Sequence, residues 1–236
     1  MGKLVQTIVQ IWQQRVSRNT LHLPSAFWSM GWLLTASALW GFYEIAEGVL
    51  DQETQNFDRE ILLSLRPWHR PWLDRLMVAI TSLGEPAILL AMSVALAGFF
   101  LWRKKTAETR MLILAAGGGL LLNFWLKHLF MRDRPLLWQH TVDVGFYSFP
   151  SGHAMMSMVV YGAIGYLLAS RYRRWWWEII LGTAVLIGAI GFSRLYLGVH
   201  WPTDVIAGYA AGVLWLVLCS FGLRLWKHQS RSGNSS

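Results

Sequence analysis

Long apolar runs separated by short charged segments constrain this sequence more than any other feature. Crossing a hydrocarbon layer about 30 Å thick takes roughly 20 helical residues. Six stretches come close to that length: Ala26–Phe42, Pro86–Trp102, Met111–Phe130, Ala154–Ser170, Trp176–Phe192 and Val205–Trp226. Because a bilayer core offers no water to unpaired backbone groups, such runs must be helices. The sequence therefore predicts an all-α polytopic membrane protein with six transmembrane helices.

The composition excludes several other classes of protein. Only 14% of the 236 residues are charged, against about 25% in an ordinary soluble domain. The one cysteine, Cys219, permits no disulfide within the chain. A net charge of +8 would ordinarily suggest nucleic acid as a partner, but the basic residues lie between the apolar runs. We therefore expect a membrane-embedded protein with no nucleic-acid partner, and exclude disordered and disulfide-rich classes.

The same basic residues indicate an orientation. If all six runs span the membrane, 13 of the 21 Lys and Arg residues fall on the side that holds both termini. Cytoplasmic loops are enriched in Lys and Arg. The other side carries most of the acidic residues: Glu44, Glu47, Asp51, Glu53, Asp58 and Glu60. The charge distribution predicts that both termini are cytoplasmic.

Shorter segments complete the predicted organisation. Residues 1–25 contain an amphipathic stretch, Lys3–Arg18, that suits a helix lying on the inner leaflet. A second apolar stripe, Phe57–Leu65, suits the outer surface, and Trp72–Leu83 reads as a short interfacial or re-entrant helix before the second span. On the last run, Gly208 and Gly212 predict close helix packing. Residues 26–226 form the predicted six-helix domain, and residues 227–236 a disordered tail.

Polar residues at the outer end of the third run form the first candidate group. Lys127 and Arg134 are seven residues apart, which is about two helical turns. If the helix continues as far as Pro135, both side chains project from one side toward a shared point. Taken alone, the pair could equally be basic side chains that extend to lipid head groups.

The segment Pro150-Ser151-Gly152-His153 opens the fourth run. Ser151 suits the N-cap position, and the free amides of a first helical turn can bind an anion. Gly152 lets a ligand approach the backbone closely, and His153 can exchange a proton near neutral pH. An ordinary capped helix with an interfacial histidine is the plainer alternative.

The third group lies between the fifth and sixth runs. Arg194 closes the fifth run, and His200 and Asp204 are four residues apart, one helical turn. A carboxylate at this spacing can accept a hydrogen bond from one ring nitrogen, which leaves the lone pair of the other nitrogen available to a substrate. A helix-capping Asp with an uninvolved His is the plainer alternative.

The predicted topology places all three groups at one depth on one face of the membrane. Ionisable groups at such a depth are costly, so three unrelated structural explanations together are improbable. Cations and helix-start amides suit the charged oxygens of a phosphoryl group in its transition state. We name Lys127, Arg134, Ser151, Gly152 and Arg194 the phosphate cage. Asp204 is the one carboxylate in these motifs, so we expect no metal and no cofactor.

These motifs resemble the three-part signature of the type 2 phosphatidic-acid phosphatase superfamily, in its membrane-bound lipid phosphate phosphatase branch. The matching segments are Lys127-x6-Arg134-Pro135, Pro150-Ser151-Gly152-His153 and Ser193-Arg194-x5-His200-x3-Asp204. The resemblance implies that His200 is the nucleophile and becomes a phosphohistidine, that Asp204 orients His200, and that His153 is the general acid. It also implies that the phosphate cage holds the substrate phosphate, in a bacterial cytoplasmic membrane. The charge distribution predicts that the active site lies on the extracytoplasmic face of that membrane.

The lipid substrate stays open at this stage. Phosphatidate, phosphatidylglycerol phosphate and a polyprenyl diphosphate such as the undecaprenyl carrier all suit a phosphate cage beside a membrane. Two other classes of protein are alternatives to a lipid phosphatase. One is a relative of the vanadate-dependent haloperoxidases, which are soluble, and the other is a membrane protein that binds anionic lipid without catalysis. Binding alone would need the cations and amides but not both histidines and Asp204, which favours hydrolysis.

Overall fold

The structure is a computed structural model that describes residues 22–139, 142, 145 and 147–232. The chain divides into two compact units, Met1–Ser37 and Ala38–Ser236. The described part of the first unit is the beginning of helix α2 (His22–Leu50). The amphipathic helix predicted for residues 3–18 lies outside the described residues. The second unit contains the end of α2 and every other element.

Every regular element among the described residues of the second unit is a helix, and turns and loops join these helices. This confirms the all-α prediction. The elements that follow α2 are α3 (Gln55–Leu65), the turn η1 (Arg66–Trp68), α4 (Pro71–Ser82), α5 (Pro86–Trp102), α6 (Thr106–Ile113), the π-helical turn η2 (Leu114–Gly118), α7 (Gly119–Phe130), α8 (Gly152–Arg171), the turn η3 (Arg173–Trp175), α9 (Trp176–Tyr196) and α10 (Pro202–Ser232). Proline opens α4, α5 and α10, where a missing N–H costs nothing.

Length and composition support four or five membrane spans among the described helices. Four are Thr106–Phe130, which joins α6, η2 and α7, then Gly152–Arg171, Arg173–Tyr196 and Pro202–Leu223. Helices α4 and α5 meet at an angle of 44° and form a fifth candidate if the pair is one broken span. Helix α5 matches its predicted apolar run but has only 17 residues, a little short of the roughly 20 that a span requires. The six predicted spans are therefore confirmed only in part.

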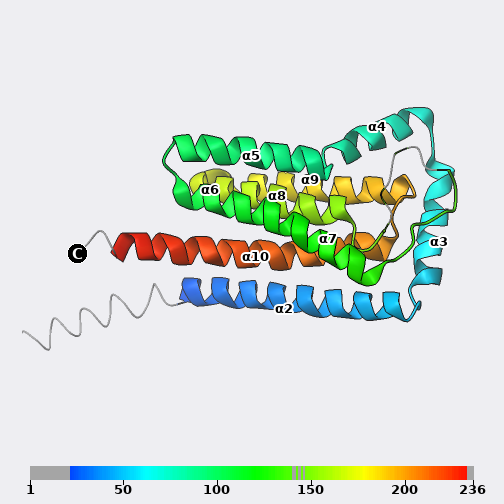
Figure 1. The fold of residues 1–236 in the computed structure, drawn as a ribbon, viewed down its shortest axis with the longest axis horizontal. Helices are drawn as coiled ribbons and strands as arrows, with labels where there is room; N and C mark the ends of the chain where they lie inside the picture. Colours follow the sequence, from blue (N-terminus) through cyan, green and yellow to red (C-terminus); the bar gives the residue numbers. More distant parts are fainter. Residues whose placement is uncertain (1–21, 140–141, 143–144, 146, 233–236) are drawn as a thin grey trace, which may run out of the picture. The chain divides into compact units, whose positions relative to one another are not determined.

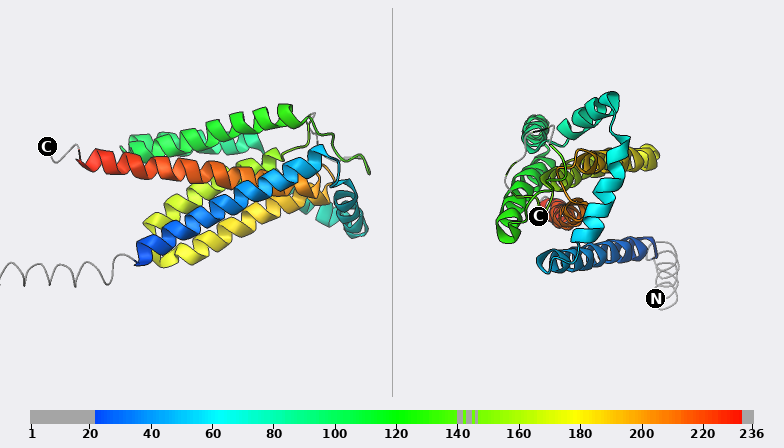
Figure 2. Two further views of the ribbon diagram at one scale, coloured as in Figure 1. Left: turned by 90° about the horizontal axis from the view of Figure 1, so that it is seen from below. Right: turned by 90° about the vertical axis from the view of Figure 1, so that its right-hand side faces the viewer.

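Helix α8 packs against both α9 and α10, and Figures 1 and 2 show the three running alongside one another. Glycines on α10 permit the close approach. A Cβ added at Gly208 would lie 2.8 Å from the carbonyl oxygen of Ser151, and one added at Gly212 would lie 2.8 Å from Cβ of Met158. The predicted packing role of these glycines is confirmed, and it brings the first turns of α8 and α10 together.

Helix α3 crosses the ends of α9 and α10, which it contacts (Figure 1). The helix predicted over Phe57–Leu65 is confirmed, as is the short helix predicted over Trp72–Leu83. The buried face of α3 is not purely apolar, however. Asp58 and Leu62, one turn apart, are its buried residues, whereas Phe57 is 54% exposed. A buried carboxylate on α3 needs a partner, and the partner lies in the candidate site.

Two predicted helix ends are wrong. Helix α7 stops at Phe130, and Met131 adopts a left-handed conformation with φ 45°. Arg134 therefore lies in the loop after α7 and not two turns along the same helix from Lys127. Helix α10 runs on to Ser232, so part of the tail predicted to be disordered from residue 227 is helical.

Candidate active site

Lys127 and Arg134 meet at the carbonyl oxygen of Tyr147, although they do not share a helix. Lys127, in the last turn of α7, donates from Nζ to this oxygen at 2.7 Å. Arg134 reaches it from the following loop, with Nη2 at 3.2 Å, and also donates from Nη1 to the carbonyl oxygen of Val199 at 2.7 Å. Backbone carbonyls thus hold the two cations side by side.

The first turn of α8 lies beside this pair. Ser151 caps the helix as predicted, accepting from the amide of Ala154 at 3.5 Å. A Cβ added at Gly152 would lie 3.0 Å from Oδ1 of Asn123 and 3.9 Å from Cε of Lys127. The absence of a side chain at Gly152 therefore leaves the helix start close to the lysine.

Arg194 enters from the last turn of α9 and is only 3% exposed. Its Nη1 donates to Oγ1 of Thr81 on α4 at 2.8 Å. Its Nε is buried and has no hydrogen-bond partner among the described residues. A buried donor without a partner costs free energy, which an anion accepting from Nε would recover.

His200 is held between a carboxylate and a guanidinium. Its Nδ1 lies 3.3 Å from Oδ2 of Asp204, and its Nε2 lies 3.1 Å from Nη1 of Arg134. Because a carboxylate only accepts and a guanidinium only donates, Nδ1 carries the proton and Nε2 keeps its lone pair. The lone pair of His200 therefore points toward the cations.

The remaining charged groups of the site lie around the imidazole of His200. Burial lowers the pKa of His200 well below its usual range, and the positive charges of Arg134, Arg194, Lys127 and His153 lower it further. The amide of Ser151 also donates to the carbonyl oxygen of Asp204 at 2.9 Å. The structure thus gathers the predicted residues in one place: Lys127, Arg134, Ser151, Gly152, His153, Arg194, His200 and Asp204.

Two carboxylates and one arginine near this site are not among the residues that the three sequence motifs specify: Asp58, Glu85 and Arg132. Glu85, in the break between α4 and α5, places Oε2 3.1 Å from Nε2 of His153. Arg132 donates from Nη1 to Oδ1 of Asp204 at 2.8 Å and from Nη2 to Oδ2 of Asp58 at 2.7 Å. In the sequence, Arg132 lies between Lys127 and Arg134. This position inside the first motif was the one feature that could have indicated that Arg132 belongs to the site.

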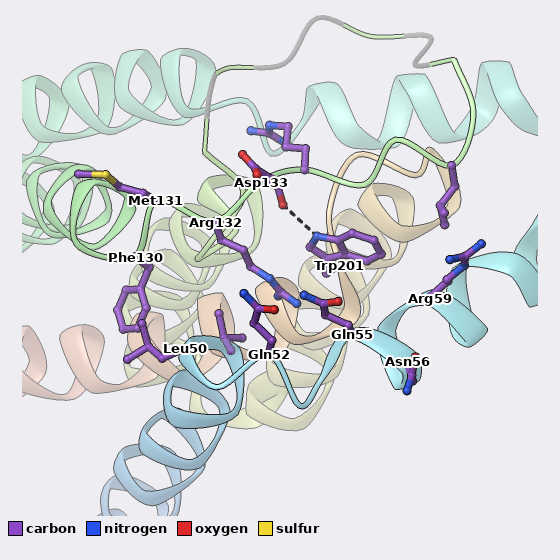
Figure 3. Close-up of a pocket in the computed structure, with 13 residues that line it drawn as sticks. Leu50, Gln52, Gln55, Asn56, Arg59, Phe130, Met131, Arg132, Asp133 and Trp201 are labelled. Carbon is purple, nitrogen blue, oxygen red and sulfur yellow. Dashed lines mark hydrogen bonds between the residues drawn. The ribbon is translucent and has the colours of Figure 1, made fainter.

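A cavity of about 480 Å³ lies beside the loop that carries Arg132 and Arg134. Figure 3 shows Arg132 extending into it, toward Gln52 and Gln55. Trp201 forms part of the wall and donates from its indole to the carbonyl oxygen of Asp133 at 3.0 Å (Figure 3). Both Gln52 and Gln55 are exposed, so this cavity opens on the surface.

No group of three or more His, Cys, Asp or Glu side chains among the described residues is arranged to hold a metal ion. The expectation of metal-independent chemistry stays a prediction, which an assay in the presence of a chelator tests.

Comparison with known proteins identifies the family of this chain. The sequence profile of the PAP2 superfamily matches residues 90–225. Phosphatidylglycerophosphatase B of Bacillus subtilis is 36% identical over 180 residues, covering 73% of this chain and 86% of that protein. Undecaprenyl-diphosphatase BcrC of Bacillus subtilis is 30% identical over 158 residues, covering 62% of this chain and 72% of that protein.

A solved structure is also similar. The crystal structure of a transmembrane PAP2-type phosphatidylglycerolphosphate phosphatase from Bacillus subtilis matches with a TM-score of 0.73 and 32% identity. The match covers 79% of this chain and 94% of that chain. The chain therefore belongs to the PAP2 superfamily and is a multi-pass membrane lipid phosphatase of that family.

Proposed function

We propose that this enzyme cleaves the phosphate from a membrane lipid in two transfers through His200. The observation that carries the proposal is the environment of one imidazole, with Asp204 at Nδ1 and Arg134 at Nε2. A neutral, buried histidine whose lone pair faces a group of cations suits attack on a phosphorus atom held by those cations.

In the first transfer, Nε2 of His200 attacks phosphorus. A phosphorus–nitrogen bond forms while the bond from phosphorus to the lipid oxygen breaks. His153 gives a proton to the departing oxygen, so the lipid leaves as a neutral alcohol. Asp204 accepts from Nδ1 throughout and stabilises the positive charge that the phosphorylated imidazole acquires.

In the second transfer, water attacks phosphorus and the phosphorus–nitrogen bond breaks. His153, now neutral, takes a proton from the water, which restores both histidines and releases inorganic phosphate. The phosphate cage acts in both steps. Lys127, Arg134 and Arg194, with the hydroxyl of Ser151 and the amide of Gly152, stabilise the charge on the equatorial oxygens.

Phosphatidylglycerol phosphate is the substrate we propose, because the similarity to a phosphatidylglycerophosphatase covers most of both chains. Undecaprenyl diphosphate is a second candidate, supported by the shorter match to an undecaprenyl-diphosphatase. The test is a competition assay in which the purified enzyme meets phosphatidylglycerol phosphate, undecaprenyl diphosphate and phosphatidate together. We expect the highest kcat/KM on phosphatidylglycerol phosphate. A preference for undecaprenyl diphosphate would overturn this choice of substrate but not the assignment of the enzyme as a lipid phosphatase.

We further propose six spans, with α2 and α5 added to the four candidate spans given above, both termini cytoplasmic and the site on the extracytoplasmic face. Support comes from the helix ends: Lys127 and Arg194 end two spans, whereas Arg171 and Arg173 mark the opposite ends. In a Cys219→Ser background, an impermeant maleimide should label Leu136→Cys in intact cells, since Leu136 is 86% exposed. Lys105→Cys should react only after lysis, and the reverse pattern would invert the orientation.

A further inference from the structure

Arg132 joins two buried carboxylates that come from distant parts of the chain. Its Nη1 donates to Oδ1 of Asp204 at 2.8 Å, and its Nη2 donates to Oδ2 of Asp58 at 2.7 Å. The side chains of Asp58 and Asp204 are 0% exposed, and that of Arg132 is 12% exposed. We call these three residues the carboxylate bridge. It links α3 to the first turn of α10.

The two oxygens of Asp204 have separate tasks. Oδ2 accepts from Nδ1 of His200 and, at 2.8 Å, from the amide of Trp201. Oδ1 accepts from Arg132. A carboxylate can rotate about its last bond, so the guanidinium on Oδ1 fixes the plane in which Oδ2 meets the imidazole.

Asp58 holds Arg132 and the start of α10 together. Its Oδ1 accepts from the amide of Thr203 at 3.0 Å, and its Oδ2 accepts from Oγ1 of Thr203 at 2.7 Å. Arg132 also donates from Nη1 to Oγ1 of Thr203 at 2.8 Å. Oxygen atoms thus surround the arginine, and the planar guanidinium has little freedom to turn.

We infer that Arg132, anchored by Asp58, is a positioning residue for the reaction: it fixes the Asp204 carboxylate and, through it, the tautomer and the direction of attack of His200. This inference rests on the proposed function. Arg132 itself touches Asp204 and not the imidazole. Its effect should therefore appear in the rate of phosphoryl transfer and not in the binding of the phosphate group.

A structural role must be separated from a positioning role. Arg132→Gln alone leaves two carboxylates buried without their cation, which destabilises the fold. Arg132→Gln combined with Asp58→Asn removes one positive and one negative charge, so the buried cluster keeps its net charge. The double variant should fold, yet Oδ1 of Asp204 still lacks its guanidinium. The matched control is Arg59→Gln with Glu60→Gln, which removes the same two charges from exposed positions of α3.

The experiment measures Tm, kcat, KM and phosphoenzyme formation with the lipid substrate and with an aryl phosphate. By analogy with partners that orient metal-binding histidines, kcat of the double variant should fall about 10- to 100-fold. Its KM should stay within about a factor of two of the wild-type value, and its Tm should stay within a few degrees of the wild-type value. The fall should be similar on both substrates, because a misdirected nucleophile slows attack whatever the leaving group. The control should match the wild type.

Each alternative outcome is informative. Full activity in the double variant would show that Arg132 only neutralises the buried carboxylates, which overturns the inference. A rise in KM at unchanged kcat would also overturn it, by placing Arg132 among the groups that bind substrate. If the wild-type enzyme formed no phosphoenzyme, the proposed function itself would fail, and that result needs no variant.

Discussion

The two sides of His200 differ in how completely their polar groups are paired. On the Nδ1 side, both oxygens of Asp204 and both oxygens of Asp58 accept hydrogen bonds from buried or half-buried donors. On the Nε2 side, cations converge on backbone carbonyls, and Nε of Arg194 lies buried with no partner among the described residues. One side is complete in itself, whereas the other still has donors to offer an anion.

This difference separates two tasks that act on one imidazole. The side with paired carboxylates sets the orientation and tautomer of the nucleophile. The side with cations binds the group that is attacked. Substitutions on the cation side should therefore respond to the chemistry of the substrate, whereas substitutions on the carboxylate side should slow every substrate alike.

Among substitutions that leave His200 in place, the largest expected effect is that of His153→Ala on lipid hydrolysis. General acid catalysis contributes about 100- to 10,000-fold, and the rate on a lipid alcohol should fall by that factor. An aryl phosphate has a leaving group that needs no proton, so phosphorylation by it should lose far less. The comparison is made by single-turnover kinetics on both substrates. Equal losses on both would contradict the role of general acid.

The next largest effect is expected for Arg194→Ala. Loss of one preorganised donor should lower kcat about 30- to 1,000-fold. Orthovanadate, which adopts the five-coordinate geometry of the transition state, should inhibit the wild type competitively and the variant much more weakly. The control is Leu181→Ala on the same helix, whose side chain is 66% exposed. A variant altered in KM alone would limit Arg194 to binding of the ground state.

A smaller effect concerns stability against pH. Burial keeps the pKa of His200 well below its usual range in the folded enzyme, whereas in the unfolded chain the imidazole has a pKa of about 6.5. As pH falls below that value, the unfolded state binds more protons, so the free energy of unfolding decreases by up to about 1.4 kcal/mol per pH unit. We expect denaturation in detergent to show a steeper loss of stability for the wild type than for His200→Gln between pH 6.5 and about pH 5. Parallel curves would mean that His200 is not held neutral.

No effect is expected from chelation. The phosphate cage supplies the positive charge that a metal would otherwise provide, so activity should persist in excess EDTA. Activity lost in EDTA and restored by Mg²⁺ would contradict the metal-independent mechanism.

Sequence patterns predicted the parts of the fold that depend on neighbours along the chain. The apolar run of α5 matched its helix residue for residue, and Ser151 was correctly predicted as the N-cap of α8. The left-handed turn at Met131 was not predictable, because nothing in the local composition requires it. The helical spacing therefore predicted that α7 continues beyond Phe130, which is wrong. Arg134 nevertheless lies close to Lys127, because both donate to the carbonyl oxygen of Tyr147.

The carboxylate bridge illustrates what a sequence alone conceals. Asp58 and Asp204 are 146 positions apart, and neither the stripe on α3 nor the spacing of the motifs pairs them with Arg132. An amphipathic stripe predicts which side of a helix is apolar, but it does not reveal a polar residue that is buried because a distant cation lies opposite. Pairings of this kind depend on tertiary structure.

In the mechanism we propose, phosphorus is transferred to Nε2 of His200, and mapping the phosphoenzyme is the decisive experiment. The enzyme is mixed with lipid substrate labelled in its phosphate, quenched within milliseconds at alkaline pH, where phosphohistidine survives, and digested for peptide mapping. We expect label on the peptide that contains His200 in the wild type and none in His200→Ala. Label on another residue, or an active His200→Ala enzyme, would contradict it.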